Sequence, residues 1–160
     1  MLTLVRIDDR LIHGQVVEGW LPVLKAQRIV VVCDQAAADP TTRALMELSV
    51  PPAVALDVLT VASAPSTLKN AAGTPERVLV LAPGPQEVLA LHEAGVPFAA
   101  VNVGGLHYAA GTVQLGRAIY LDAADIDSLE ALAERGVRVE GRAVPSESPL
   151  DVMAALKARA

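Results

Sequence analysis

Short runs of β-branched and other apolar residues alternate with segments of helical periodicity along almost the whole chain. Continuous apolar runs are typical of strands buried on both faces, as the strands of a parallel sheet are. The expected strands cover residues 2–7, 28–33, 54–58, 77–82, 98–103, 118–121 and 137–141, with another short strand around Val113. This alternation predicts an α/β fold: a doubly wound, mostly parallel sheet with helices on both faces.

The helical segments fill the intervals between these strands. A first helix should begin near Gln15, and Pro22 should bend or shorten it. Its inner face is expected to carry Val16, Val17, Trp20, Leu21 and Leu24. The other helices are expected at residues 61–71, 86–94 and 124–135 and from 149 or 150 to 158, with Gly95 in a left-handed cap position.

One more helix has clear start and stop signals. Asp39 and Pro40 supply a cap and a proline for its first turn, and Pro51-Pro52 ends it. Its inner side is expected to carry Ala44, Leu45 and Leu48.

Length and composition favour one cytoplasmic domain covering residues 1–160. Aromatic residues make up only 2% of the chain, so the core must be built from aliphatic side chains. No apolar run approaches the roughly 20 residues of a membrane span, and a cleavable leader is not expected. The single cysteine, Cys33, cannot form an internal disulfide and is expected to be a buried thiol, which fits a reducing compartment.

The net charge of −5 and the scarcity of stacking aromatics argue against nucleic acid as a partner. Positive charge can matter locally, and Arg6 and Arg10 lie close together in the chain. They belong to the stretch from Val5 to Val16, which places two arginines, two aspartates and His13 between the first strand and the first helix. In an open parallel sheet, such a loop lies at the crevice where ligands bind, and the following helix attracts anions. A neutral imidazole beside guanidinium groups suits the acceptance and release of a phosphoryl group.

The string RIDDRLIHGQV, followed by Trp20, closely resembles the active-site signature of the mannose/fructose/sorbose-family IIB components of the bacterial sugar phosphotransferase system. The stretch from Val101 to Tyr108 is similar to that family as well, and the likeness extends through Arg135–Val137 and Arg142–Pro145. This resemblance implies a phosphocarrier that takes phosphate from a IIA phosphohistidine and gives it to a sugar entering through a membrane IIC/IID permease. It also implies that His13 is the phosphorylated residue.

The neighbouring charged residues are expected to have different tasks. Arg10 should neutralise the phosphoryl oxygens, because a planar fork of donors suits them. Arg6 either shares that task or forms a structural pair with Asp8 or Asp9. The two aspartates should hold the arginines, cap the loop, or accept the second imidazole N–H, so Arg6 and Asp9 are candidates for an orienting role. A metal site and a cofactor are not expected.

Other residues are expected to line the crevice. Gly14 should let the backbone turn and the phosphate approach closely. The remaining candidates are Gln15, Asp34, Asn102, Gly104 and Gly105, with a simple turn role as the alternative for Asp34. His107 is expected to be a surface residue rather than a second phosphate carrier. No GxGxxG follows the first strand and no GxxxxGK[ST] occurs, so a nucleotide-binding function would rest on fold analogy alone.

Two classes of function remain open on the sequence. One is the phosphotransferase, with a phosphorylated IIA protein on a separate chain, a membrane IIC/IID permease and a sugar as partners. The other is a regulatory binding module that responds to phosphorylation without a role in transport. The sequence specifies neither the sugar nor the oligomeric state.

Overall fold

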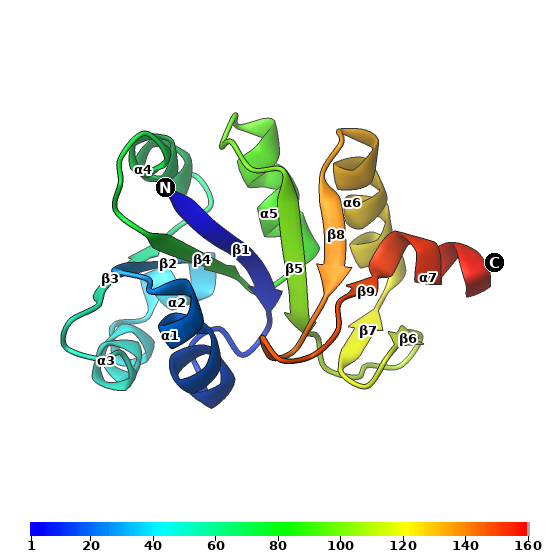
Figure 1. Ribbon diagram of the computed structural model, residues 1–160, viewed down its shortest axis with the longest axis horizontal. Coiled ribbons are helices and arrows are strands. Elements are labelled where there is room, and N and C mark those ends of the chain that lie inside the picture. Colours follow the sequence, from blue (N-terminus) through cyan, green and yellow to red (C-terminus); the bar gives the residue numbers. More distant parts are fainter. Residues whose placement is uncertain (160) are drawn as a thin grey trace.

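The computed structural model describes residues 1–159 and contains a seven-stranded sheet in the order β3-β2-β4-β1-β5-β8-β9 (Figure 1). Neighbouring strands in it are parallel, except that β9 runs antiparallel to β8. The strands are β1 (Leu2–Asp8), β2 (Arg28–Val32), β3 (Ala55–Leu59), β4 (Val78–Ala82), β5 (Ala100–Gly105), β8 (Arg138–Gly141) and β9 (Leu150–Asp151). A separate antiparallel hairpin is formed by β6 (Val113–Leu115) and β7 (Ile119–Leu121).

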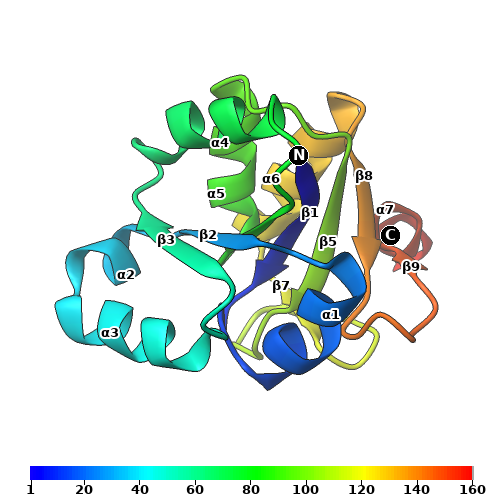
Figure 2. The ribbon, with the colours of Figure 1, turned by 60° about the vertical axis from the view of Figure 1, so that its left-hand side comes forward.

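Helices cover both faces of the sheet, so the predicted doubly wound α/β fold is confirmed (Figure 2). The helical elements are a π-helical segment η1 (Gln15–Trp20) and the α-helices α1 (Leu21–Leu24), α2 (Asp34–Ala38), α3 (Pro40–Ser49), α4 (Ala64–Ala72), α5 (Pro85–Glu93), α6 (Ala123–Glu134) and α7 (Val152–Arg159). Pro22 lies in the first turn of the four-residue α1, which follows η1 without a break and ends at Leu24.

Alternating side chains of β4 divide the interior into two cores. Val78 and Val80 belong to one core with Leu68 of α4 and Val88 of α5. Leu79 and Leu81 belong to the other, with Val16 of η1 and Leu21 of α1. The strand is buried on both faces, as its continuous apolar sequence indicates.

The first strand in the chain lies inside the sheet, between β4 and β5. The chain builds β2, β3 and β4 on one side of β1 and then β5 and β8 on the other, so the connections diverge at β1 (Figure 1). Ligands bind at such a switch point, beyond the carboxyl ends of the strands. The register places Asp8 beside Gly105 of β5, so the loops after β1 and β5 meet at this edge.

The prediction for the inner side of α3 was wrong. Ala44, Leu45 and Leu48 are exposed, Leu48 by 84%, and no residue of α3 is fully buried. The cause is α2, which the sequence pattern did not predict. This helix contributes the buried Ala36 to the core and contacts β3, and α3 packs beside it.

The start of the last helix was also expected too early. Leu150 and Asp151 form β9, which pairs antiparallel with the end of β8, and α7 begins at Val152. Edge strands of two residues leave almost no periodicity in the sequence.

Candidate functional site

Arg6 is a fully buried cation at the carboxyl half of β1. Its Nη2 donates to Oδ2 of the equally buried Asp8 at 3.0 Å, and its Nη1 donates to Oδ1 of Asn102 at 2.6 Å. The same two nitrogens also donate to the backbone carbonyls of Arg142 and Ala143. Burial lowers the pKa of Arg6, and the attraction of Asp8 opposes that shift. Both terminal nitrogens of Arg6 are thus used within the protein, and the residue holds Asp8 in place.

The surroundings of Arg6 leave little room for other groups. The guanidinium lies 5.1 Å from the centre of the Trp20 ring, and the Trp20 Nε1–H donates to the carbonyl of Ala143 at 3.0 Å. On another side it fills the space in which a side chain at Gly104 would begin. Gly104 therefore leaves room for the arginine in the interior, and it also lines a cavity of about 540 Å³, described below, as expected for a crevice residue.

The imidazole of His13 is bound to the carboxylate that Arg6 holds. His13 Nε2 lies 2.9 Å from Oδ2 of Asp8, while the backbone N–H and Nε–H of Arg10 donate to Oδ1 at 3.1 and 3.3 Å. Burial by itself would raise the pKa of the Asp8 carboxyl, but the hydrogen bonds from Arg10 and the imidazole outweigh burial and lower it. Asp8 is therefore an anion that accepts the Nε2–H, which leaves the Nδ1 lone pair of His13 available.

Burial lowers the pKa of His13, and the positive charges of Arg10 and Arg6 act in the same direction against the opposing pull of Asp8. The side chain is 15% exposed. A neutral, partly accessible imidazole with one nitrogen fixed by a carboxylate is a suitable nucleophile.

Arg10 extends from the Asp8–His13 pair to the protein surface. Its side chain is 37% exposed, and its Nη2 donates to Oε1 of Gln15 at 2.9 Å and lies 3.4 Å from Oδ2 of Asp8. The guanidinium is thus held beside His13 while part of it remains open to an anionic ligand.

Asp9 does not contact His13, so the orienting role expected for it falls to Asp8. Its carboxylate instead accepts from the backbone N–H of His107 at 2.8 Å and lies 2.6 Å from Nδ1 of the same residue. The backbone N–H of Asp9 also donates to the carbonyl of Gly105 at 3.1 Å. Asp9 therefore fastens the loop after β5 to the loop after β1.

The sharp turn expected at Gly14 is also absent. Gly14 has the ordinary right-handed dihedral angles φ −53° and ψ −44°, and a Cβ there would meet nothing within 4 Å. The strained residue of the loop is the buried Leu11, with φ +56°. Open space beside His13 is what Gly14 provides.

Asp34 has a structural contact rather than a place at His13. It accepts a hydrogen bond from the backbone N–H of Val61 at 2.8 Å and so joins the ends of β2 and β3. Asp34 also does not line either of the two cavities, described in the next paragraph, that Gln15 borders. The turn role is therefore the one the structure supports.

Two cavities of about 340 and 540 Å³ are both lined by Gln15 at the start of η1 and by Arg117 and Ala143, and the smaller one also borders the loop after β1. Arg10 lines the first and Arg142 the second. Arg117 was missed by sequence reasoning, because its place depends on how the β6–β7 hairpin packs against β5, and no local pattern encodes that contact.

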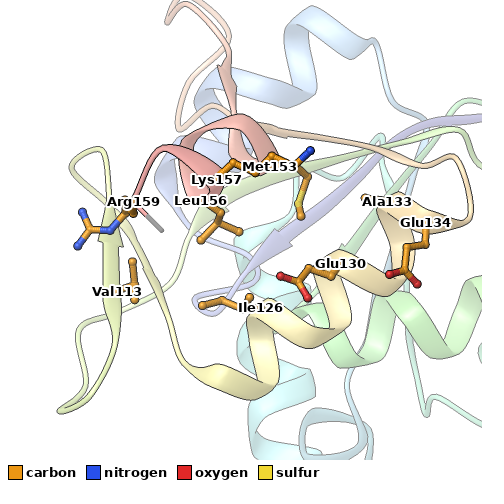
Figure 3. Close-up of a pocket in the computed structure, with 9 residues that line it drawn as sticks. All are labelled: Val113, Ile126, Glu130, Ala133, Glu134, Met153, Leu156, Lys157 and Arg159. Atoms are coloured by element: carbon orange, nitrogen blue, oxygen red, sulfur yellow. The ribbon is translucent and has the colours of Figure 1, made fainter.

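A larger cavity, of about 780 Å³, lies elsewhere, between α6, α7 and β6 (Figure 3). Its lining contains apolar side chains such as Ile126, Met153 and Leu156, with Glu130 on α6 and Lys157 on α7. It contains no histidine and no residue of the loop after β1. The size of a cavity alone therefore does not identify the candidate functional site.

Within residues 1–159, no helix is both long enough and apolar enough to cross a membrane. Within the same residues, no group of three or more histidine, cysteine, aspartate or glutamate side chains is placed to hold a metal ion.

Curated relatives resemble the chain over most of its length. It is 36% identical to the sorbose-specific EIIB component of Klebsiella pneumoniae, covering 95% of this chain and 93% of that one. It is 32% identical to the sorbose-specific EIIB component of Lacticaseibacillus casei, covering 96% and 94%. It is also 38% identical to the mannose-specific EIIAB component of Escherichia coli K12, where the match covers 96% of this chain but only 47% of the relative.

The fold has a solved counterpart of the same kind. The IIBSor domain of the sorbose permease from Klebsiella pneumoniae superimposes with a TM-score of 0.93 at 34% sequence identity, covering 100% of this chain and 98% of that one. The family model of the PTS system sorbose subfamily IIB component matches residues 2–160. The chain therefore belongs to the sorbose subfamily of IIB components of the PTS, the bacterial sugar phosphotransferase system.

Proposed function

We propose that the protein is a phosphocarrier that accepts a phosphoryl group from a IIA phosphohistidine on Nδ1 of His13 and passes it to a sugar. The observation that carries this proposal is the 2.9 Å contact between His13 Nε2 and the buried carboxylate of Asp8. That contact fixes one nitrogen as a donor and leaves the other as the nucleophile. Family membership supports the same reaction class, since these components are phosphotransferases.

In the first step the P–N bond of the donor breaks and a new P–N bond forms at His13 Nδ1. The attacking nitrogen needs no deprotonation, because the lowered pKa of His13 keeps it neutral at physiological pH. Once phosphorylated at Nδ1 and protonated at Nε2, the ring carries positive charge. The Asp8 carboxylate stabilises that charge, as an orienting aspartate does for an imidazolium in hydrolytic triads.

Arg10 supplies the positive charge that stabilises the transferred phosphoryl group. Phosphoryl transfer depends mainly on positioning and on neutralising the equatorial oxygens. Arg10 is held by Asp8 and Gln15 yet remains partly exposed, so it can turn its free donors toward a phosphoryl group on His13. Arg6 serves the reaction indirectly, by holding Asp8.

In the second step the P–N bond of phosphorylated His13 breaks, with its electron pair returning to Nδ1, while a sugar hydroxyl oxygen bonds to phosphorus and releases its proton to water. We infer that this transfer takes place at a membrane permease of the IIC/IID type and that the chain works at the cytoplasmic face beside it; membership of the sorbose subfamily of IIB components supports this inference. The names of the relatives include sorbose, mannose and fructose, and the sugar used by this chain is left to experiment.

The test is transfer of labelled phosphate from a phosphorylated IIA protein to the purified chain. We expect acid-labile label on wild type and on the matched variant His107→Ala, which removes an exposed loop histidine, and no label on His13→Ala. Equal labelling of His13→Ala would contradict the proposal. Loss of sugar uptake in a cell that carries His13→Ala separates transport from a purely regulatory role, for which uptake would be unchanged.

A further inference from the structure

Two cavities near the proposed phosphorylation site are adjacent, because both are lined by Gln15, Arg117, Ala118 and Ala143, and together they are named the arginine groove. Their volumes, about 340 and 540 Å³, lie in the range of small-molecule sites. The groove starts at Arg10, whose guanidinium shares the Asp8 carboxylate with His13. It therefore begins beside the imidazole that carries the phosphoryl group.

Positive charge collects in this groove although the chain is acidic overall. Arg10, Arg117 and Arg142 line it, against the two carboxylates of Asp9 and Glu147. Among residues 1–159, neither Arg117 nor Arg142 has a carboxylate partner within 4 Å, and Nε of Arg142 is buried without any acceptor. Arginines without a carboxylate partner favour an anionic ligand in the groove, which can accept hydrogen bonds from their guanidinium groups.

The groove also offers groups that suit a sugar. The amide of Gln15 has its oxygen bound to Arg10, which leaves its N–H groups to donate to hydroxyls. Tyr120 lines the end near Arg10 and packs edge-to-face against the exposed Tyr108, with ring centres 5.7 Å apart. A phenol and an aromatic surface next to a cluster of arginines fit a ligand that has both hydroxyls and a phosphate.

We propose that the arginine groove binds the sugar phosphate released by transfer from His13, with its phosphate on Arg117 and Arg142 and its hydroxyls near Gln15 and Tyr120. The identity of the ligand rests on the proposed function, whereas the binding itself does not require phosphorylation of His13. Such binding makes the unphosphorylated chain sensitive to its own product.

The experiment is isothermal titration calorimetry of the unphosphorylated full chain with fructose 1-phosphate, inorganic phosphate or fructose as the probe. We expect fructose 1-phosphate to bind with a Kd on the order of 1 mM or lower. Inorganic phosphate should bind about tenfold more weakly, because it lacks the hydroxyls, and fructose should give no measurable heat.

Substitutions assign the binding to the groove. Arg117→Gln and Arg142→Gln should each weaken fructose 1-phosphate binding by about tenfold or more, since each removes a charged donor. The matched control is Arg138→Gln, which removes an exposed arginine at the opposite end of β8 from Arg142. Arg142→Lys, which keeps the charge, serves as a second variant if Arg142→Gln melts at a lower temperature. The titration uses wild type without any IIA protein, so this result is independent of the phosphorylation assay.

Three outcomes would overturn the proposal. Equal affinity for inorganic phosphate and fructose 1-phosphate would mean that the hydroxyls are not recognised. An equal loss in Arg138→Gln would mean that only overall charge matters. If Arg117→Gln and Arg142→Gln leave fructose 1-phosphate binding unchanged and instead raise the KM for the phosphorylated IIA protein, the groove is a docking surface for that protein.

Discussion

The guanidinium of Arg6 occupies the space in which a side chain at Gly104 would begin. Gly104→Ala must therefore displace a fully buried cation together with its bonds to Asp8 and Asn102. We expect a loss of roughly 1–3 kcal/mol in the free energy of unfolding, the usual cost of overpacking a core. Urea denaturation measures it. Gly14→Ala is the matched control, expected to change stability by less than about 0.5 kcal/mol, because a Cβ at Gly14 meets nothing within 4 Å.

Replacing Asp8 by asparagine should slow phosphorylation of His13 by at least about 100-fold, since the neutral amide neither fixes the imidazole tautomer nor stabilises the charged phosphorylated ring. The initial rate of label transfer from a phosphorylated IIA protein measures this. Asp9→Asn, one residue along the chain, changes a carboxylate that contacts His107 instead of His13 and should retain most of the rate. Similar losses in both variants would contradict the assignment of Asp8.

Arg10 should be sensitive to the shape of its side chain as well as to its charge. Arg10→Lys keeps the charge but loses the planar fork that binds Asp8 and Gln15 together, and we expect about a tenfold slower transfer. Arg10→Gln removes the charge as well and should cost about 100-fold. A lysine variant with the wild-type rate would show that a point charge suffices.

The lowered pKa of His13 predicts a particular pH dependence. Burial, the largest cause, disfavours the imidazolium, so the ring stays neutral below its ordinary pKa of about 6.5. The rate of phosphoryl acceptance should therefore remain level as pH falls to 6.5 and decline only at lower pH. NMR titration of the His13 ring gives the midpoint directly, and a midpoint at or above 6.5 would contradict the prediction.

The same shift affects stability. Between the lowered pKa of the folded state and about 6.5, the unfolded chain binds more protons at this histidine than the folded chain does. The contribution of His13 to folding is therefore fully present above pH 6.5 and is lost as pH falls through that window. Comparing urea midpoints of wild type and His13→Ala across pH 5 to 8 isolates this contribution.

Much of the fold was predictable because the strands are continuous apolar runs, for which few alternatives exist. The inner face of α3 was not, since Leu45 and Leu48 follow a helical spacing and yet remain exposed. Spacing shows which residues share a face, but it does not show whether another element, here α2, already covers the core.

Part of the candidate site was likewise predictable from the sequence, and part was not. The separate tasks of Asp8 and Asp9 carried a local signal that could have been used: successive side chains of a strand point to opposite faces, so Asp8 shares the face of Arg6 and Asp9 does not. The positions of His107, which contacts Asp9, and of Arg117, which lines both cavities, had no such signal. They reach the site from strands and loops far along the chain, through packing that only the folded structure specifies.

The central place of β1 in the sheet has a consequence for how proteins of this kind diversify. The proposed nucleophile His13, its carboxylate partner Asp8 and the exposed Arg10 all come from ten consecutive positions, residues 6–15, at a strand that lies between two halves of the sheet built by later parts of the chain. Changes in the outer helices and hairpins can therefore alter which proteins or sugars are recognised while the reacting groups are inherited together as one short segment.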